Sequence, residues 1–146
     1  MIGLLQRVAE AAVRIDGAEV ARIGPGLLVL VGVRPDDDQR QGERLLERVL
    51  GYRVFADAQG RMNRSLRECQ GGLLLVPQFT LAADTAAGTR PGFSTAAAPG
   101  VAEPLFAALV SRARDLHPQV AAGRFGADMQ VSLINDGPVT FWLESR

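Results

Sequence analysis

Two short and wholly apolar runs constrain the fold of this chain more than any other feature of its sequence. They are Leu27–Val31 and Leu73–Val76, and glycines precede both of them. Apolar runs of this length between breaker residues are typical of strands that are buried on both faces. We therefore expect a chain built around a sheet that contains these two segments.

Further strands are expected in the first half of the chain. Ile2–Ile15 is rich in Val, Ile, Leu and Ala, and Asp16-Gly17 follows it as a turn signal. Glu19–Ile23 then alternates between polar and apolar residues up to a Gly-Pro-Gly breaker. Tyr52–Phe55 is a candidate for a shorter strand.

The end of the chain predicts a hairpin. Met129, Val131 and Leu133 have the period of a strand, and the period returns from Val139 onward, after Asp136-Gly137-Pro138. Two such runs around a glycine-containing turn predict two paired strands with Pro138 at the tip.

Two helices are expected. Leu45, Leu46, Val49 and Leu50 have helical spacing, and an aspartate of the preceding run 36–38 suits the N-cap position. Binding of a metal ion is the alternative role for these three aspartates. Val101–Leu116 predicts a second helix with Pro104 in its first turn, and residues 82–100 predict a loop. The segments together predict a mixed α/β architecture with more strands than helices.

Composition limits the classes of function. The chain has 146 residues, 47% of them hydrophobic, which predicts one domain over residues 1–146. Sixteen basic and sixteen acidic side chains cancel. This balance argues against a protein that grips long nucleic acid, since neutralisation of phosphates supplies most of that affinity. Recognition of a short RNA end needs only a few arginines.

Neither the start of the chain nor its single cysteine points to secretion or metal binding. Arg7 and Glu10 come too early for a signal peptide, and no apolar run approaches a membrane span. One cysteine, Cys69, forms no intrachain disulfide or cysteine-rich metal site, and we expect it on a polar loop. A cytoplasmic protein without metal, cofactor or membrane partner is expected.

The sequence offers few side chains for acid–base chemistry. Its one histidine, His117, precedes a proline at the end of a predicted helix, where a surface position is the alternative to a catalytic role. Without His117, no Ser-His-Asp or Cys-His arrangement exists. No dinucleotide or Walker motif occurs. Gly123-Arg124-Phe125-Gly126 matches the loop of KH modules, but strand-like residues follow it.

Two segments stand out as candidates for function. Pro77-Gln78-Phe79-Thr80 places polar groups directly after a buried strand, where loops often carry function. A capped strand end is the alternative. Asn135–Thr140 places a proline in a turn, and a plain turn is the alternative there.

Taken together, these segments resemble the D-aminoacyl-tRNA deacylase (D-tyrosyl-tRNA deacylase) family of the bacterial type. The pieces occur in order over the whole chain, and all of them together are specific although each alone is weak. Position 77 departs from the family pattern, which usually has Ser there. Pro77 lacks both the hydroxyl and the backbone N–H, so we expect substrate affinity or rate to differ. The pieces are Gln6-Arg7-Val8, Gly26–Leu30, Arg48–Arg53, Arg61-Met62-Asn63, Gln78–Leu81, Arg90–Ser94, Gly123–Met129 and Asn135–Thr140.

The resemblance implies a fold, an activity and an assembly. The fold would have strand-rich mixed sheets, barrel-like, with two main helices. The activity would be hydrolysis of the ester bond of D-aminoacyl-tRNA, a chiral proofreading step that rejects L-aminoacyl-tRNA. Glycyl-tRNA, mischarged on tRNA(Ala), would be hydrolysed too. The partners would be the aminoacylated 3′ end of tRNA and a second copy of the chain, whose cis Gly137-Pro138 turn would complete each site.

The resemblance also implies roles for single residues. Phe79 and Thr80 would offer backbone amides to the oxyanion, and Gln78 would orient the substrate. Thr80 as nucleophile is one mechanism, and the 2′-hydroxyl of the RNA is the one we favour, because no base accompanies Thr80. Phe125 and Met129 would hold the terminal adenine, with core packing as the alternative. Arg7 would steady the Gly137-Pro138 turn, with an ordinary surface role as the alternative.

Two rival functions remain at this point. One is a non-catalytic RNA-binding module with the same fold, which needs no acid–base residues. The other is a strand-rich dimeric interaction protein in which the Gly-Pro turn only fastens the subunits together. Release of amino acid from D-aminoacyl-tRNA separates both rivals from the hydrolase.

Overall fold

A computed structural model describes residues 1–146 of the chain. Its sheet is centred on one long strand, β1 (Ile2–Ile15), which has β8 (Gln130–Glu144) on one side. On its other side β1 pairs first with β3 (Gly26–Gly32) and then with β2 (Ala18–Ile23), all antiparallel. Two parallel strands extend the sheet beyond β3, namely β6 (Gly72–Pro77) and then β7 (Val120–Ala122).

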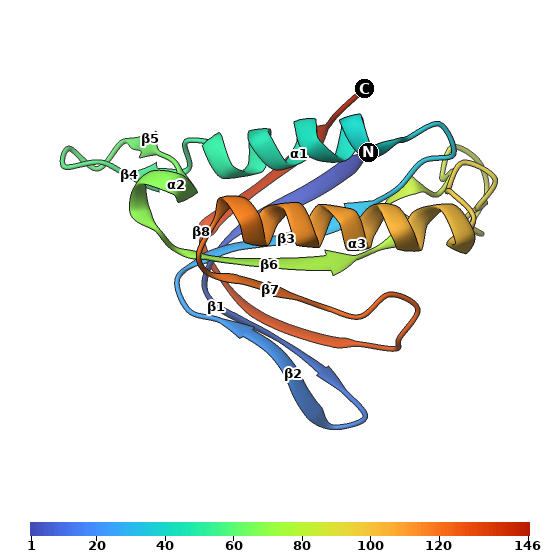
Figure 1. The fold of residues 1–146 in the computed structure, drawn as a ribbon, viewed down its shortest axis with the longest axis horizontal. Helices are drawn as coiled ribbons and strands as arrows, with labels where there is room; N and C mark the ends of the chain where they lie inside the picture. Colours follow the sequence, from blue (N-terminus) through green and yellow to red (C-terminus); the bar gives the residue numbers. More distant parts are fainter.

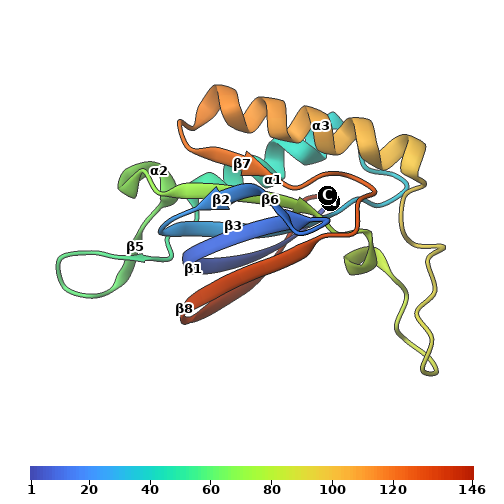
Figure 2. The same cartoon turned by 90° about the horizontal axis from the view of Figure 1, so that it is seen from below.

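The two faces of the sheet are covered differently. Helices α1 (Gln39–Gly51) and α3 (Pro99–Leu116) lie together over one face (Figure 1). The other face curls over itself, as the view from below shows (Figure 2), and encloses a second apolar cluster. The result is a nearly closed, barrel-like sheet with a helical layer, as the resemblance implied. The second cluster contains Val8, Ala11, Val13, Ala21, Ile23, Leu28, Leu74 and Val76.

The buried strands β3 and β6 approach each other closely at their first residues. A Cβ atom on Gly26 would lie 1.9 Å from the carbonyl oxygen of Gly72, so only glycine fits at position 26. From this pair onward, β3 and β6 pair residue by residue as far as Val31 and Pro77. This register fixes where β6 ends and where the polar segment after it begins.

The aspartates before α1 serve the helix and the N-terminus. Asp38 is the N-cap: its carboxylate accepts from the backbone amides of Arg40 and Gln41, and the Gln41 side chain accepts from the Asp38 amide. Asp37 accepts from the N-terminal ammonium group and from the amide of Arg34. Asp36 is exposed, and no cluster that could hold a metal ion includes it.

The hairpin predicted at the end of the chain is wrong. Residues 130–144 form one strand, and both of its halves pair with β1: Asn135 lies opposite Val8 and Thr140 opposite Gln6. The four residues between them bulge out opposite Arg7. The Asn135 side chain closes this bulge by accepting from the amide of Val139 at 2.7 Å and donating to Thr140 Oγ1 at 2.9 Å.

Several short elements differ from expectation. Of the segment 52–55, only Phe55 belongs to a strand, β4 (Phe55–Ala56), which pairs with β5 (Met62–Arg64). α2 (Leu66–Cys69) and the 3₁₀ helix η1 (Phe79–Ala82) were not predicted. Cys69 is partly buried at the end of α2 rather than on a polar loop. α3 begins at Pro99, so Pro104 lies beyond its first turn.

The prediction that His117 lies on the surface is also wrong. Its side chain is buried, with 3% of the residue exposed, and its Nε2 lies 2.6 Å from the carbonyl oxygen of Gly71. This contact joins the end of α3 to the start of β6.

None of the helices combines the length and the apolar composition that a membrane-spanning helix needs.

Candidate active site at the end of strand β6

A pocket opens where β6 ends, and five of the residues predicted for the site line it. They are Pro77, Gln78, Phe79, Phe125 and Met129. Its volume is about 720 Å³, a size that suits a nucleoside with an attached aminoacyl group. The wall is mainly apolar and is completed by the loop that precedes α3, including Phe93, Ser94 and residues 96–99.

The segment Gln78-Phe79-Thr80 presents two free backbone amides. The amide of Gln78 donates to Val31 O at 2.7 Å, which ties the segment to β3. Phe79 and Thr80 then open η1, and neither amide donates a hydrogen bond within the chain. Two neighbouring unpaired N–H groups beside a pocket are the arrangement that stabilises an oxyanion.

The hydroxyl of Thr80 has no base beside it. Its one hydrogen bond within the chain comes from Gln78 Nε2, 2.5 Å from Thr80 Oγ1. An amide N–H is a donor and does not take a proton from the hydroxyl. Thr80 lines a second hollow of about 900 Å³, together with Trp142 and Arg34, whereas its neighbours Gln78 and Phe79 line the first pocket.

Glycine at position 123 shapes the wall that carries Met129. A Cβ atom at this position would lie 2.8 Å from the Met129 sulfur. The same sulfur lies 3.3 Å from the backbone amide nitrogen of Arg124. Phe125 packs partly against the main core, and Met129 against the cluster under the curled sheet. Both residues thus belong to the core and to the pocket wall at once.

The turn at Gly137-Pro138 has the cis peptide bond that the resemblance implies. Gly137 and Pro138 are exposed. Arg7 is hydrogen-bonded to the turn, because its Nε donates to Asp136 O at 2.8 Å. Its Nη1 donates to Val54 O at 2.5 Å. The Arg7 side chain is 17% exposed, so the guanidinium is largely enclosed between these partners.

Within one chain, the turn and the pocket lie at different positions along the strands and on different strands of the sheet. Pro77 pairs with Val31, and Val31 pairs with Gly3. The turn bulges opposite Arg7, four residues further along β1. Four residues of a strand span about 13 Å, and three strand spacings of nearly 5 Å separate β8 from β6. The structure therefore does not bring this turn to the Thr80 of its own chain.

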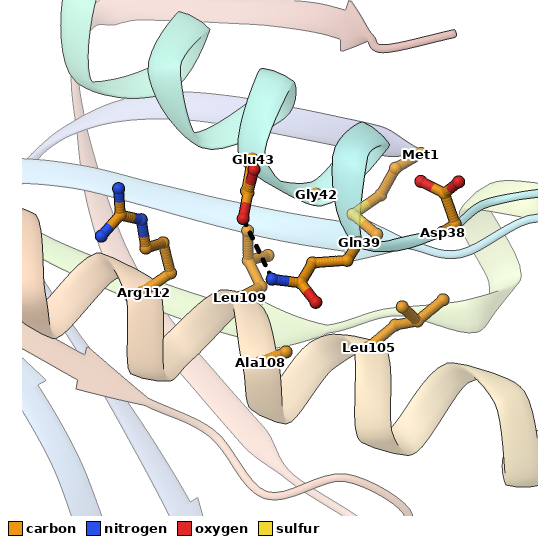
Figure 3. A pocket seen from close by; sticks show the side chains of 9 residues that line it. All are labelled: Met1, Asp38, Gln39, Gly42, Glu43, Leu105, Ala108, Leu109 and Arg112. Atoms are coloured by element: carbon orange, nitrogen blue, oxygen red, sulfur yellow. Dashed lines mark hydrogen bonds between the residues drawn. The ribbon is translucent and has the colours of Figure 1, made fainter.

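Two other features are excluded as sites. The cavity between α1 and α3 has a volume of about 10 Å³, enough for one water molecule at most (Figure 3). In it, Gln39 donates to Glu43 at 3.0 Å across one helical turn. His117 contacts the first residues of β6, whereas the pocket lies at the other end of that strand. This position excludes a catalytic role for His117 in the pocket.

Sequence reasoning gave no separate role to Phe93 or to Gly123. Phe93 and Phe79 are both exposed, and their rings lie 5.1 Å apart at the pocket. They are fourteen positions apart in the chain, and the loop before α3 brings them together. The signal available was the motif Arg90–Ser94, which contains Phe93 but no indication of its partner.

The geometry suits the class of enzymes that cleave an already activated ester. Two free amides beside the pocket can donate to an oxyanion, and no ionisable group is hydrogen-bonded to the nearby Thr80 hydroxyl. The family model described as D-Tyr-tRNA(Tyr) deacylase matches residues 4–144. The chain therefore belongs to the D-Tyr-tRNA(Tyr) deacylase family.

Individual relatives agree with this assignment. The chain is 64% identical over 146 residues to a D-aminoacyl-tRNA deacylase of Alkalilimnicola ehrlichii, covering 100% of this chain and 97% of the relative. A D-aminoacyl-tRNA deacylase of Azotobacter vinelandii is 62% identical over 145 residues, which are 99% of this chain and 100% of the relative.

Solved structures show the same fold. One described as "c-Myc DNA Unwinding Element Binding Protein" is 36% identical, with a TM-score of 0.95 over 100% of this chain and 99% of the other. A second is described as a probable eukaryotic D-amino acid tRNA deacylase. It has 18% identity and a TM-score of 0.85 over 98% of both chains, a likeness of fold alone.

Proposed function

We propose that this chain hydrolyses the ester bond of D-aminoacyl-tRNA at the pocket beside Gln78-Phe79-Thr80. Family membership makes the chain a D-aminoacyl-tRNA deacylase, a hydrolase that releases the amino acid from tRNA. The observation that carries the placement of the site is the pair of free amides at Phe79 and Thr80. They would donate to the ester oxygen as negative charge develops on it.

The terminal nucleoside would occupy the apolar part of the pocket. Phe125 and Met129 offer an aromatic face and a thioether, both of which pack well on a base. This places the ester near the open end of η1, where Gln78 would orient the substrate. Pro77 lines the same wall and offers neither a hydroxyl nor an N–H to the substrate.

A water molecule would attack the ester carbonyl, and the 2′-hydroxyl of the terminal ribose, rather than the Thr80 hydroxyl, would hold and polarise it. The bond to the ribose 3′-oxygen then breaks, and that oxygen takes up the proton that the water loses. Thr80 Oγ1 receives a hydrogen bond from Gln78 and has no group to accept its proton. An aminoacyl ester is already activated, so positioning and oxyanion stabilisation supply most of what the reaction needs. The protein then contributes geometry, and the substrate contributes the hydroxyl.

Chiral selection would come from the Gly137-Pro138 turn of a second subunit. The separation of turn and pocket within one chain, the exposure of the turn and its support by Arg7 favour an arrangement across a dimer. The free edge of β8 offers backbone groups for pairing, and the exposed Trp142 offers apolar surface for the dimer. Backbone carbonyls of the turn would accept from the amino group and leave no room for an L side chain.

Glycine lacks the side chain that such a turn excludes. Glycyl-tRNA, including glycine mischarged on tRNA(Ala), would therefore enter the site and be hydrolysed together with D-aminoacyl-tRNA. A steric filter rejects what is too large and has no means to reject what is smaller.

Replacement of Thr80 by Val tests the chemical step. The variant keeps the shape and the backbone amide but lacks the hydroxyl, so we expect kcat for D-tyrosyl-tRNA to stay within about tenfold of the unmodified protein. The unmodified protein should hydrolyse D-tyrosyl-tRNA that ends in 2′-deoxyadenosine more than about a thousandfold more slowly. This is the scale of the effect when a reacting group is removed. A thousandfold loss in Thr80→Val, with full activity on the deoxy substrate, would establish Thr80 as the nucleophile instead.

Mixed dimers test the arrangement across subunits. Met129→Arg fills the pocket with a charged side chain, and Gly137→Ala distorts the turn, because a Cβ there lies 2.8 Å from the Val139 nitrogen. A dimer with one substitution in each subunit has one intact pocket facing one intact turn if the turn acts in trans. We expect about half of the unmodified activity with full preference for D substrate. No selective activity in the mixed dimer means that pocket and turn work within one chain.

A further inference from the structure

A basic arm protrudes from the end of the molecule that is remote from the pocket. The basic arm is the segment 53–69, which contains β4, β5 and α2. It extends beyond the end of α1, opposite the loop before α3 in both views (Figures 1 and 2). All basic side chains of this protein are arginines, and four of them are exposed on the arm: Arg53, Arg61, Arg64 and Arg67.

These four arginines have no ion-pair partners. No carboxylate lies within 4.0 Å of any of them; of the sixteen arginines in the chain, Arg7, Arg22, Arg34 and Arg146 form ion pairs. The arm contains two carboxylates, and both are turned onto backbone amides. Asp57 accepts from Gln59 and Arg61 at 2.9 Å, and Glu68 accepts from Ser65 at 2.6 Å. The arm thus has an excess of positive charge in a chain whose formal charge is zero.

The base of the arm is joined to the Gly137-Pro138 turn. Arg7 donates to Val54 O, at the root of the arm, and to Asp136 O, at the start of the turn. Beside this link, Tyr52 packs edge-on against Phe141 of β8, with ring centroids 5.5 Å apart. The Arg7 bonds therefore join the arm to the turn, and the contact of Tyr52 with Phe141 joins the residues next to them.

We infer that the basic arm of one subunit binds backbone phosphates of the acceptor stem of the tRNA whose 3′ end occupies the pocket of the other subunit. The inference rests on the proposed function, in which the turn of one subunit reaches its partner's pocket. An arm fixed to that turn lies next to the same pocket. The unpaired 3′ end of tRNA is only a few nucleotides long, so the acceptor duplex would lie within reach of an arm that projects from beside that pocket.

The chemistry of the arm suits such a ligand. Arginine presents a planar fork of donors that matches a phosphate group. Duplex RNA is bound mainly through phosphates and 2′-hydroxyls, because its deep major groove does not admit side chains. Arg53 is oriented by Asn63 and Arg64 by the carbonyl of Glu68, whereas Arg61 and Arg67 are free of side-chain bonds. Arg61 and Arg67 can therefore be replaced without loss of a side-chain hydrogen bond within the protein.

The test compares a long and a short substrate. Arg61→Gln/Arg67→Gln should raise KM for D-tyrosyl-tRNA about tenfold at physiological salt. The slope of log(kcat/KM) against log salt should decrease in magnitude by about 2, or nearly one for each lost phosphate contact. Hydrolysis of D-tyrosyl-adenosine, which has no stem, should not change. Arg112→Gln/Arg114→Gln, an equal loss of charge from two exposed residues of α3, should leave both substrates unaffected.

The outcomes separate this inference from the proposed function. If the unmodified protein hydrolyses neither substrate, the proposed function is wrong. If it hydrolyses both, and the arm variant keeps the original salt slope and KM for tRNA, the role of the arm is wrong.

Mixed dimers then assign the arm to a subunit. With Met129→Arg in one subunit, a single working pocket remains. The arm substitutions should weaken tRNA hydrolysis when they accompany Met129→Arg, and should have no effect in the subunit with the working pocket. The opposite pattern means that the arm serves its own chain, and it overturns the inference.

Discussion

Gly123 controls how far the sulfur of Met129 reaches into the pocket. A Cβ atom at position 123 would lie 2.8 Å from this sulfur, so Gly123→Ala must displace the flexible methionine, which lines the proposed site of the base. We expect KM for D-tyrosyl-tRNA to rise about fivefold with little change in kcat, a partial loss of the 1–3 kcal/mol that base stacking contributes. Steady-state kinetics checks this. Gly100→Ala, where no atom lies within 4 Å, is the matched control.

The residues of the candidate site were predictable only as a set. Local chemistry gave Gln78-Phe79-Thr80 no advantage over a capped strand end, and the order of motifs along the whole chain selected it. The bonds from Arg7 to Asp136 and Val54 join residues that are 129 and 47 positions apart. His117 was misplaced for the same reason, since Gly71, its hydrogen-bond partner, is 46 positions away. Contacts of this range leave no local pattern.

At the scale of elements, the start of α1 depends on Asp38. Asp38→Ala removes the acceptor for the amides of Arg40 and Gln41, and we expect a loss of about 1 kcal/mol in the free energy of unfolding. For a chain of this length the melting temperature should fall by about 2–4 °C. Asp36→Ala removes the same charge from an exposed side chain without hydrogen bonds, and should leave thermal unfolding unchanged. Equal shifts in both variants would mean that charge, and not the cap, is responsible.

Strands were easier to predict than their connections. The buried runs of β3 and β6 and the whole of β1 follow from hydrophobic period and turn signals. β8 does not, because Asp136-Gly137-Pro138 has the composition of a hairpin turn. The strand continues past it since both of its halves find partners on β1 and Asn135 closes the bulge. Pairing with a distant strand overrode the local turn signal.

At the scale of the whole molecule, the two ends of the chain meet, and Glu144 lies where they do. Hydrogen bonds from Arg34 first, and then from Trp142, lower the pKa of Glu144 from 4.5 to about 2. The folded state therefore favours the ionised form. The stability that this provides is complete above pH 4.5 and is lost as the pH falls towards 2.

Chemical unfolding at a series of pH values checks this linkage. Glu144→Gln should be less stable than the unmodified protein at pH 7, and the difference should shrink between pH 4.5 and pH 2. Glu103→Gln, on the exposed side of α3, should show no such convergence. A difference for Glu144→Gln that is constant over this range would contradict the lowered pKa.

The fold of one chain was within reach of sequence reasoning, and the complete site was not. Hydrophobic period and resemblance together predict the barrel-like sheet and its two main helices. The register of β1, β3 and β6 shows that pocket and turn of one chain lie apart, a separation that no short motif contains. The proposed site is a property of two chains, and so is the proposed role of the basic arm.

Release of tyrosine from matched D- and L-tyrosyl-tRNA, measured with the purified protein under identical conditions, tests the central claim most directly. We predict rapid release from the D form and no release above the uncatalysed rate from the L form. Equal rates for the two forms, or no release from the D form, would contradict the account.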